Sequence, residues 1–168
     1  MARIRLILSL LITTLVLDQI TKEWARNFFA THPPLSFIGG IVNILHSENP
    51  GAFLSLGAGM SENLRFYVFT IGVAIFLLGA IVYVLRTKDL DRGSLIAITL
   101  MVGGGIGNLI DRAFRGTVTD FIHLGVGPIQ TGVFNVADMA ITGGTIFLFL
   151  TSFRKEGAKN HPGPDLRN

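Results

Sequence analysis

Two aspartates, Asp120 and Asp138, lie beside membrane-length apolar segments in the stretch 119–138, TDFIHLGVGPIQTGVFNVAD. Two carboxyl groups held close together in a low-dielectric site cannot both ionise, so such a pair shares one proton. One member then acts as general base on a water molecule while the other polarises a carbonyl group. These residue types therefore point to hydrolysis by a carboxylate pair, provided that the fold brings the two aspartates together.

A bound metal ion is the competing interpretation of the same two aspartates, because hard cations bind carboxylates. The sequence contains no HExxH pattern and no cluster of histidines beside Asp120 or Asp138. His123 lies in the same stretch, and we interpret it as an interfacial residue rather than as a base or a ligand. A carboxylate pair without a metal is therefore favoured, and no cofactor is expected.

The composition indicates a protein of the lipid bilayer. Of the 168 residues, 49% are hydrophobic and 15% are charged, and the mean hydropathy is +0.56, whereas soluble domains have about 25% charged residues. The net charge of +3 does not indicate nucleic-acid binding, because the basic residues stand at segment ends rather than in a patch. The chain has no cysteine, which excludes disulfides, thiolate metal sites and cysteine nucleophiles.

Four segments have the length and apolar character of transmembrane helices, for which about 20 residues suffice. They cover residues 4–17 with a less apolar extension to about 24, residues 66–85, residues 94–109 with an extension to 112, and residues 134–153. Arg3 and Arg5 before the first segment are typical of a signal peptide, but no small-residue cleavage site follows. We therefore expect the first segment to be a retained helix.

Residues 27–63 form the longest stretch outside these segments. Pro33 and Pro34 end any helix there, and the following residues mix β-branched and aromatic side chains with glycines. The predicted fold is a mainly α membrane protein, with four transmembrane helices and a small β-containing extramembrane element between the first two. One domain would cover residues 1–155, and residues 156–168 would form a polar, disordered tail.

The distribution of Lys and Arg predicts the orientation in the membrane. Both ends and the loop 86–92 carry nine of them, Arg3, Arg5, Arg86, Lys88, Arg92, Arg154, Lys155, Lys159 and Arg167. The opposite side carries five, Lys22, Arg26, Arg65, Arg112 and Arg115. Because positive residues favour the cytoplasm, we expect both termini to be cytoplasmic. Residues 27–63 and the loop that carries Asp120 would then face outward.

The polar residues in or beside the apolar segments share one feature, because this topology places all of them near the outer surface. They are Asp18, Asn108, Asp111, Arg112, Asp120, Asn135 and Asp138. Asn108, Asp111 and Arg112 have the spacing i, i+3 and i+4 of one helix face. Ionisable groups in membrane segments indicate function by default, although Asp111 and Arg112 could also serve only as structural partners of nearby charges or lie at the interface. The glycines of VGGGIGN at 102–108 indicate close helix packing.

Five motifs in this order resemble the lipoprotein signal peptidases, the bacterial signal peptidase II family of intramembrane aspartic proteases. They are DQITK at 18–22, ENPGAF at 48–53, GGGIGNLIDR at 103–112, VTDF at 118–121 and FNVADMAI at 134–141. The resemblance covers most of the chain. One departure is that NPGAF has a single alanine where many relatives have two, although Asn49 and Gly51 keep their places.

The resemblance implies that Asp120 and Asp138 are the catalytic pair. It also implies that a further group of residues binds substrate or supports the pair, namely Asp18, Asn49, Gly51, Asn108, Arg112 and Asn135. Residues 27–63 would correspond to a cradle that grips the substrate. The implied substrate is a prolipoprotein whose cysteine bears diacylglycerol, with cleavage just before that cysteine.

The resemblance further implies a location in the bacterial cytoplasmic (inner) membrane, contact with membrane lipids and inhibition by globomycin-type compounds. We expect a monomer that binds no nucleic acid. A small transporter or ion pathway lined by the intramembrane aspartates is the alternative. Transporters usually place ionisable groups near the midplane in repeated halves, whereas the polar residues here gather near one surface and no repeat is visible.

Overall fold

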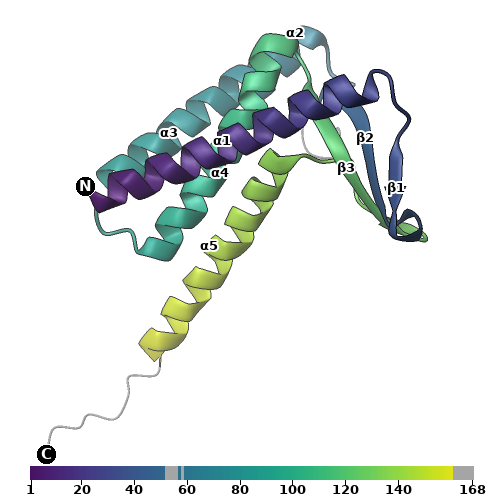
Figure 1. Ribbon diagram of the computed structural model, residues 1–168. Helices are drawn as coiled ribbons and strands as arrows, with labels where there is room; N and C mark the ends of the chain where they lie inside the picture. Colours follow the sequence, from purple (N-terminus) through teal and green to yellow (C-terminus); the bar gives the residue numbers. More distant parts are fainter. Residues whose placement is uncertain (52–56, 58, 161–168) are drawn as a thin grey trace, which may run out of the picture.

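The computed structural model describes residues 1–51, 57 and 59–160, with side chains as far as 153. It contains four helices that are long and apolar enough to cross a membrane, as predicted, and a small sheet at the end of the helices remote from the N-terminus (Figure 1). The helices are α1 (Ala2–Phe29), the continuous stretch of α2 (Glu62–Arg65), the π-helical η3 (Phe66–Gly72) and α3 (Val73–Arg86), then α4 (Arg92–Arg115) and α5 (Val136–Asn160).

The last helix is longer than the sequence predicts. The tail was expected to begin at residue 156, whereas α5 continues to Asn160. Residues 161–168 of the predicted tail lie outside the described residues, so their disorder stays a prediction. The stretch 145–156 contains neither Gly nor Pro, which allows the helix to continue beyond its apolar part.

Helix α4 occupies the centre of the bundle and contacts α1, α3 and α5. More than half of its apolar window is buried, against less than a fifth for each of the other three spans. Its glycines face all three neighbours. Toward α1, a Cβ atom added to Gly103 would lie 3.2 Å from Thr14, and one added to Gly107 would lie 2.5 Å from Asp18. Toward α5, a Cβ atom added to Gly104 would lie 2.3 Å from the Ala137 carbonyl oxygen. Toward α3, a Cβ atom added to Gly105 would lie 2.6 Å from Leu77. The glycine run is therefore a packing device, as predicted.

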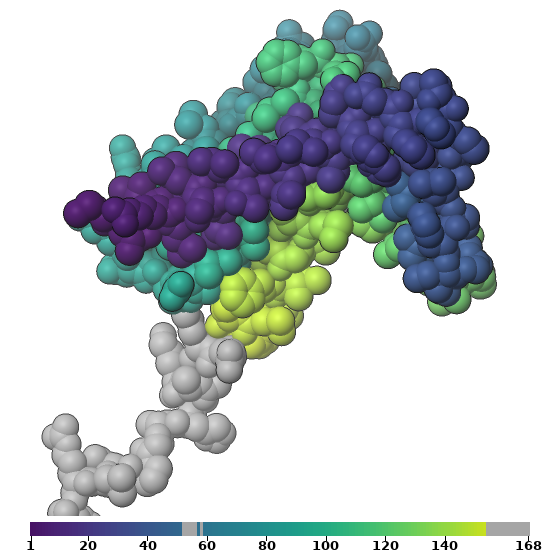
Figure 2. Space-filling view, in the orientation of Figure 1, coloured from purple at the N-terminus to yellow at the C-terminus, as the bar shows by residue number. Residues whose placement is uncertain are grey.

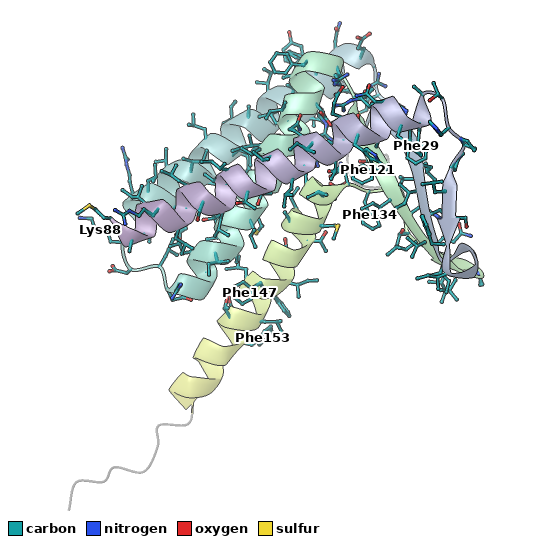
Figure 3. The ribbon with its side chains drawn as sticks, viewed as in Figure 1. Phe29, Lys88, Phe121, Phe134, Phe147 and Phe153 are labelled. Carbon is teal, nitrogen blue, oxygen red and sulfur yellow. The ribbon has the colours of Figure 1, made fainter. Side chains whose placement is uncertain are left out.

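Arg3 binds the end of α3 at the end of the bundle remote from the sheet, the end at which Lys88 is labelled in Figure 3. The Arg3 guanidinium donates hydrogen bonds of 2.6 Å to the carbonyls of Val84 and Thr87 and of 2.9 Å to that of Lys88. The last carbonyls of a helix have no partner within the helix. Arg3 thus supplies donors to the C-terminal end of α3 and fixes the start of α1 against it.

The sheet has four antiparallel strands in the order β1 (Leu35–Phe37), β2 (Val42–Asn49), β3 (Val118–Val126) and β4 (Ile129–Gln130). The strands predicted within 27–63 are confirmed by β1 and β2. The sheet also takes β3 and β4 from the connection between α4 and α5, so Asp120 lies in a strand and the prediction of a loop there is wrong. Residues 118–121 are buried on both faces, which removes the alternation by which a half-buried strand is recognised.

A β-bulge lies in β2 opposite the aspartate. Ile44 pairs with Ile122 and Ser47 with Asp120, so β2 has one residue more than β3 over this interval. Bulges of this kind turn side chains to a new direction and are common beside active sites. Beyond the bulge, Ser47, Asn49 and Asp120 share one face of the sheet.

The close packing of α4 on α5 predicts a specific sensitivity at Gly104. A Gly104→Ala side chain would meet the Ala137 carbonyl oxygen at 2.3 Å, and overpacking of this kind costs about 1–3 kcal/mol of unfolding free energy. Thermal unfolding of the purified protein in detergent measures the loss. Gly79→Ala is the matched control, because nothing lies within 4 Å of its Cβ position and alanine favours the helix. Equal stability of the two variants would contradict close contact at Gly104.

Candidate active site

Asp120 is held in β3 by two side-chain amides. Its Oδ1 accepts a 2.7 Å hydrogen bond from Asn135 Nδ2, and its Oδ2 accepts one of 3.0 Å from Asn49 Nδ2. The period of the strand places Asp120 and Val118 on the same face, where both line one cavity. Asp120 is 2% exposed, so its carboxyl group depends on these amides in place of water.

Asp138 is held at the N-terminus of α5 by a reciprocal cap. Asn135 precedes the helix, and its Oδ1 accepts a 2.9 Å hydrogen bond from the Asp138 backbone N–H. Asp138 Oδ2 in turn accepts one of 3.2 Å from the Asn135 backbone N–H, and Asp138 Oδ1 accepts one of 2.8 Å from Asn108 Nδ2. This arrangement is a capping box with Asn and Asp in its two positions. The cap fixes the rotamer of Asp138 and directs its carboxyl group at the cavity.

The path of the chain between the two aspartates brings them together. After the β3–β4 hairpin, Phe134 pairs antiparallel with Ile122, accepting from the N–H groups of Phe121 and Ile122 and donating to the Ile122 carbonyl. Phe134 and Phe121 therefore lie close together at the start of α5 (Figure 3). As a result, Asn135 is beside Asp120, and its side chain contacts both aspartates.

The electrostatics of Asp120 favour a shared proton. Its pKa is raised from the ordinary 3.8 to about 6, mainly because the group is buried, and the nearby charge of Asp138 acts in the same direction. The hydrogen bonds from Asn49 and Asn135 and the charge of Lys22 act in the opposite direction. A carboxyl group with a pKa of about 6 can keep its proton at a mildly acidic pH, where an ordinary aspartate would be ionised.

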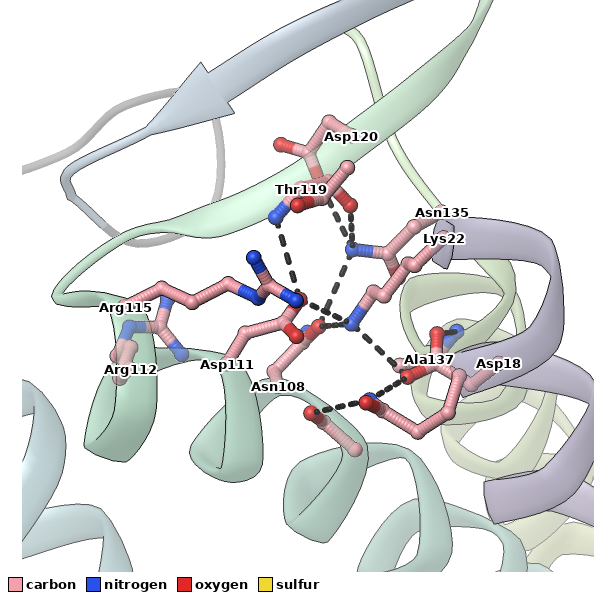
Figure 4. A network of polar contacts seen from close by, with 12 residues as sticks. Asp18, Lys22, Asn108, Asp111, Arg112, Arg115, Thr119, Asp120, Asn135 and Ala137 are labelled. Carbon is pink, nitrogen blue, oxygen red and sulfur yellow. Dashed lines mark hydrogen bonds and ion pairs between the residues drawn. The ribbon is translucent and has the colours of Figure 1, made fainter. Parts of the chain in front are cut away.

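A buried cluster of charges lies near Asp120 and is linked to it through Asn108 and Asn135 (Figure 4). Lys22 Nζ lies 2.8 Å from Asp18 Oδ2 and 3.0 Å from Asp111 Oδ2, and it donates a 2.9 Å hydrogen bond to Asn108 Oδ1. The side chains of Lys22, Asp18 and Asp111 are at most 1% exposed. Lys22 was not predicted as a site residue, because the sequence indicated only a positive charge at the outer surface. The signal was its i, i+4 spacing from Asp18 within an apolar helix.

Asp18 connects α1 to the start of α5. Its Oδ1 accepts a 2.9 Å hydrogen bond from the backbone N–H of Ala137, one of the first N–H groups of α5, which have no partner within the helix. A carboxylate at this end is also favoured by the helix dipole. Gly107 lies against Asp18, so α1, α4 and α5 meet at this carboxylate.

On the face of β2 and β3 opposite to Asp120, Thr119 forms hydrogen bonds with Glu48 and Arg26. Thr119 is fully buried, and its hydroxyl accepts a 2.7 Å hydrogen bond from Arg26 and donates one of 3.0 Å to Glu48. Burial by itself raises the pKa of Glu48, but hydrogen bonds from Thr117, His46 and Thr119 outweigh burial and lower it. The Thr119 backbone N–H donates to Asp111 Oδ2 at 3.2 Å. The strand that carries Asp120 is thereby tied to α1, α4 and β2.

Arg112 borders the cavity on the α4 side. Its Nη2 donates a 2.8 Å hydrogen bond to the Gly51 carbonyl, and its guanidinium lies 6.0 Å from the centre of the Phe69 ring. The Gly51 backbone N–H donates to Asn49 Oδ1 at 3.0 Å, which orients the Asn49 amide toward Asp120. Arg112 Nε has no hydrogen-bond partner among the described residues, so a buried donor is left at the cavity wall.

The cavity has a volume of about 530 Å³. It lies where the sheet diverges from α5, and Figure 2 shows the molecule hollowed between the two. Its polar end includes Asn49, Asn108, Arg112, Asp120 and Asp138, and its apolar part follows α5 along Met139, Thr142, Gly143 and Ile146. The site thus combines a carboxylate pair with a groove suited to an apolar ligand.

The eight residues that the resemblance assigns to the site belong to one network of hydrogen bonds and ion pairs, in which Lys22 joins Asp18 to Asn108. They are Asp18, Asn49, Gly51, Asn108, Arg112, Asp120, Asn135 and Asp138. His123 is not among the cavity residues and lies 3.5 Å from the Asn43 amide on the sheet. Within the described part of the chain, no three His, Cys, Asp or Glu side chains form a group that could hold a metal ion.

Four membrane-length helices and a carboxylate pair at one end of the bundle define a polytopic membrane protease of the aspartic type. Comparison with known proteins gives the family. The sequence model described as "Signal peptidase (SPase) II" matches residues 10–154, and the chain belongs to this family.

Curated relatives agree over most of the chain. Each of the following is named lipoprotein signal peptidase. The protein of Moorella thermoacetica is 39% identical, and the match covers 85% of this chain and 88% of that protein. The protein of Geobacillus thermodenitrificans is 36% identical, and the match covers 83% of this chain and 84% of that protein. The protein of Syntrophus aciditrophicus is 35% identical, and the match covers 87% of this chain and 91% of that protein. None of these names supports the alternative of a transporter.

The fold agrees with solved structures of bacterial membrane enzymes. One, determined by the in meso method at 2.3 Å, has a TM-score of 0.80 at 24% identity and covers 95% of this chain and 94% of its own. A second, at 1.9 Å, has a TM-score of 0.71 at 26% identity and covers 86% and 90%. The first likeness concerns the fold alone.

The raised pKa of Asp120 predicts a pH-dependent stability difference. An acid whose pKa is higher in the folded protein destabilises the fold as the pH rises from the unfolded value of 3.8 through about 6. Two pKa units correspond to at most about 3 kcal/mol. Between pH 4 and pH 7, the unfolding free energy of Asp120→Asn should therefore gain by up to this amount relative to the native chain.

Denaturation in detergent over this pH range measures the difference, with Asp89→Asn as the exposed control. A constant difference between Asp120→Asn and the native chain at all pH values would contradict a raised pKa. The variant also loses one amide hydrogen bond. This loss lowers its unfolding free energy by the same amount at pH 4 and at pH 7, so it does not change how the difference from the native chain varies with pH.

Proposed function

We propose that this protein removes signal peptides from diacylglyceryl-modified prolipoproteins by cleaving just before the lipidated cysteine, with Asp120 and Asp138 as the catalytic pair. The names of the curated relatives support the substrate class. The observation that carries the catalytic assignment is that a single side chain, Asn135, hydrogen-bonds to Asp120 and caps Asp138 at the polar end of one cavity.

The chemistry follows from the shared proton. The ionised member of the pair takes a proton from a water molecule, which attacks the carbonyl carbon of the scissile bond. The protonated member gives its proton to the carbonyl oxygen as the tetrahedral intermediate forms. On collapse, the member that took the proton from water passes it to the nitrogen of the leaving cysteine, and a hydroxyl group of the intermediate returns its proton to the other carboxylate, so the pair again holds one proton. The amides of Asn49, Asn108 and Asn135 keep both carboxyl groups directed at the cavity throughout.

The cavity suits a substrate held by a lipid. Its apolar part along Met139, Gly143 and Ile146 can receive acyl chains or the apolar signal segment, while the peptide bond reaches the polar end. Tethering to the same surface supplies orientation without many peptide contacts. The free Nε donor of Arg112 can bind a substrate carbonyl or an ester oxygen beside the pair. A globomycin-type peptide inhibitor would occupy the same polar end.

The proposed orientation has both termini in the cytoplasm of a bacterium and the catalytic pair near the outer surface of the cytoplasmic membrane, with the protein acting as a monomer among lipids. The distribution of nine Lys and Arg against five supports it. The sheet and the start of α5 lie at the opposite end of the helices from the N-terminus (Figure 1), so the pair is at the end expected to face outward.

Replacing either aspartate should abolish cleavage. Asp120→Asn and Asp138→Asn each remove the ionisable group but keep the size of the side chain, so neither can exchange the shared proton. We expect a loss of activity of at least about 10³-fold, since removal of an essential catalytic group has effects of this order. The assay follows the release of signal peptide from a purified diacylglyceryl-prolipoprotein in detergent.

Asp89→Asn serves as the matched control, because this exposed loop aspartate is remote from the site. Membrane extraction verifies that all three variants insert. Normal turnover by either site variant refutes the catalytic assignment. Chelators should leave the native activity unchanged, and a loss that added metal reverses would favour a metalloprotease.

The orientation can be tested by cysteine labelling, since the native chain has no cysteine. Ser36→Cys lies on the exposed strand β1, and Asp89→Cys lies in the exposed loop between α3 and α4. A membrane-impermeant maleimide applied to intact spheroplasts should label Ser36→Cys and leave Asp89→Cys unlabelled until the membrane is opened. The reverse pattern would overturn the proposed topology, and the cysteine-free parent reports background labelling.

A further inference from the structure

Lys22 is a buried cation of the network, and the proposed chemistry does not use it. Its side chain is completely buried, on α1, and it contacts neither Asp120 nor Asp138 directly. On the basis of the proposed catalytic pair, we propose that Lys22 is a positioning residue that fixes which end of the Asn108 and Asn135 amides faces each catalytic carboxyl group.

An amide side chain is asymmetric in its hydrogen bonding. The amide oxygen only accepts hydrogen bonds and the amide nitrogen only donates them, whereas an ammonium group only donates. Lys22 Nζ donates to Asn108 Oδ1 at 2.9 Å. The ammonium group therefore requires Asn108 to turn its oxygen toward α1. The nitrogen then points the other way, where it donates to Asp138 Oδ1 at 2.8 Å.

The second amide follows from the first. Asn108 Oδ1 also accepts a 3.1 Å hydrogen bond from Asn135 Nδ2, and the same nitrogen donates to Asp120 Oδ1 at 2.7 Å. Asn135 Oδ1 is left to accept the Asp138 backbone N–H. With this polarity, each catalytic carboxyl group accepts a hydrogen bond from an amide donor. A flipped Asn108 would bring its nitrogen against the Lys22 ammonium and the Asn135 nitrogen, and would turn its oxygen toward Asp138.

The two acidic partners of Lys22 explain how the ammonium group stays in place. Asp18 and Asp111 lie 2.8 and 3.0 Å from Nζ, and both are anchored by backbone N–H groups, of Ala137 and Thr119 respectively. Buried charges are stable only with well-placed partners. A purely structural role, in which Lys22 merely neutralises these carboxylates, is the competing explanation that the experiment must separate.

Several charged groups surround this part of the site and bear on its pH response. From α1 they are Asp18, Lys22 and Arg26, from α4 Asp111 and Arg112, from β2 Glu48, from β3 Asp120, and from α5 Asp138. Among them, Lys22 is the cation in closest contact with both Asp18 and Asp111; after its loss, Asp111 would keep only Arg26, whose Nη1 lies 3.8 Å from its Oδ1. The positive charge also opposes the effect of burial on the pKa of Asp120.

The test compares Lys22→Met, which keeps the length and removes the charge and donors, with the double variant Lys22→Met/Asp111→Asn. The double variant loses one charge of each sign, so the cluster keeps its native net charge. Both are assayed on the lipidated precursor beside the exposed control Lys88→Met. For Lys22→Met we expect kcat to fall about 10²-fold, the scale of a small misplacement of catalytic groups, with KM changed less than about threefold.

Two further readouts distinguish positioning from neutralisation. The double variant should regain thermal stability relative to Lys22→Met but should not regain kcat. In addition, Lys22→Met should add little to the kcat loss of Asn108→Ala, because a double-mutant cycle reports dependence of one residue on the other. The acid limb of the kcat/KM profile should move to higher pH in Lys22→Met, because removal of a positive charge raises the pKa of Asp120.

The proposal is overturned if Lys22→Met keeps native kcat, if the double variant recovers kcat together with stability, or if the losses at Lys22 and Asn108 are independent. Each of these outcomes is distinct from failure of the proposed function. That failure would appear as normal cleavage by Asp120→Asn or Asp138→Asn, whereas inactive aspartate variants beside a fully active Lys22→Met would refute the positioning role alone.

Discussion

The geometry of the site depends on one buried side chain, the amide of Asn135. Its oxygen caps α5 through the Asp138 backbone N–H, and its nitrogen donates to Asp120 and to Asn108. Asn135 is fully buried, so each of these hydrogen bonds replaces water and any one left unmade would be costly. A helix start and a strand are therefore held in register by the same group. The antiparallel bridge at Phe134 is what delivers Asn135 to that position.

Burial of charge imposes a second constraint, on the distances between helices. Lys22 and its two carboxylates lie at the junction of α1, α4 and α5, and such a cluster is stable only when its members are in direct contact. Larger residues on α4 would hold the helices apart. Gly107, which lies against Asp18, and Gly104, which lies against the Ala137 carbonyl, allow the approach. The glycine run and the charged cluster are thus two parts of one arrangement.

The sequence predicted those features that depend on local composition. Apolar length gave four helices, and the segment predicted at 134–153 placed Asp138 near the start of the last one. Features that depend on pairing between distant segments were missed or wrong. Asp120 was expected in a loop because β3 is covered on both faces and shows no alternation. Lys22 was counted as a surface charge because its partner Asp111 lies on another helix. The positions of Asn49 and Gly51 came from family resemblance, since no local pattern links them to the aspartates.

The position of the site at the end of the bundle reconciles two opposed requirements of the proposed reaction. Hydrolysis needs water and ionisable groups, which the interior of a bilayer disfavours, whereas a lipid-anchored substrate needs an apolar surface. The cavity meets both needs because its walls come from different elements. The sheet and the caps of α5 supply amides and Asp120, and the body of α5 continues as an apolar wall to Ile146. Asp138 lies where these walls join, on the first turn of α5. A carboxylate pair placed deeper along α5 would lose the backbone N–H groups of the helix start, and one placed farther out on the sheet would lose the apolar wall.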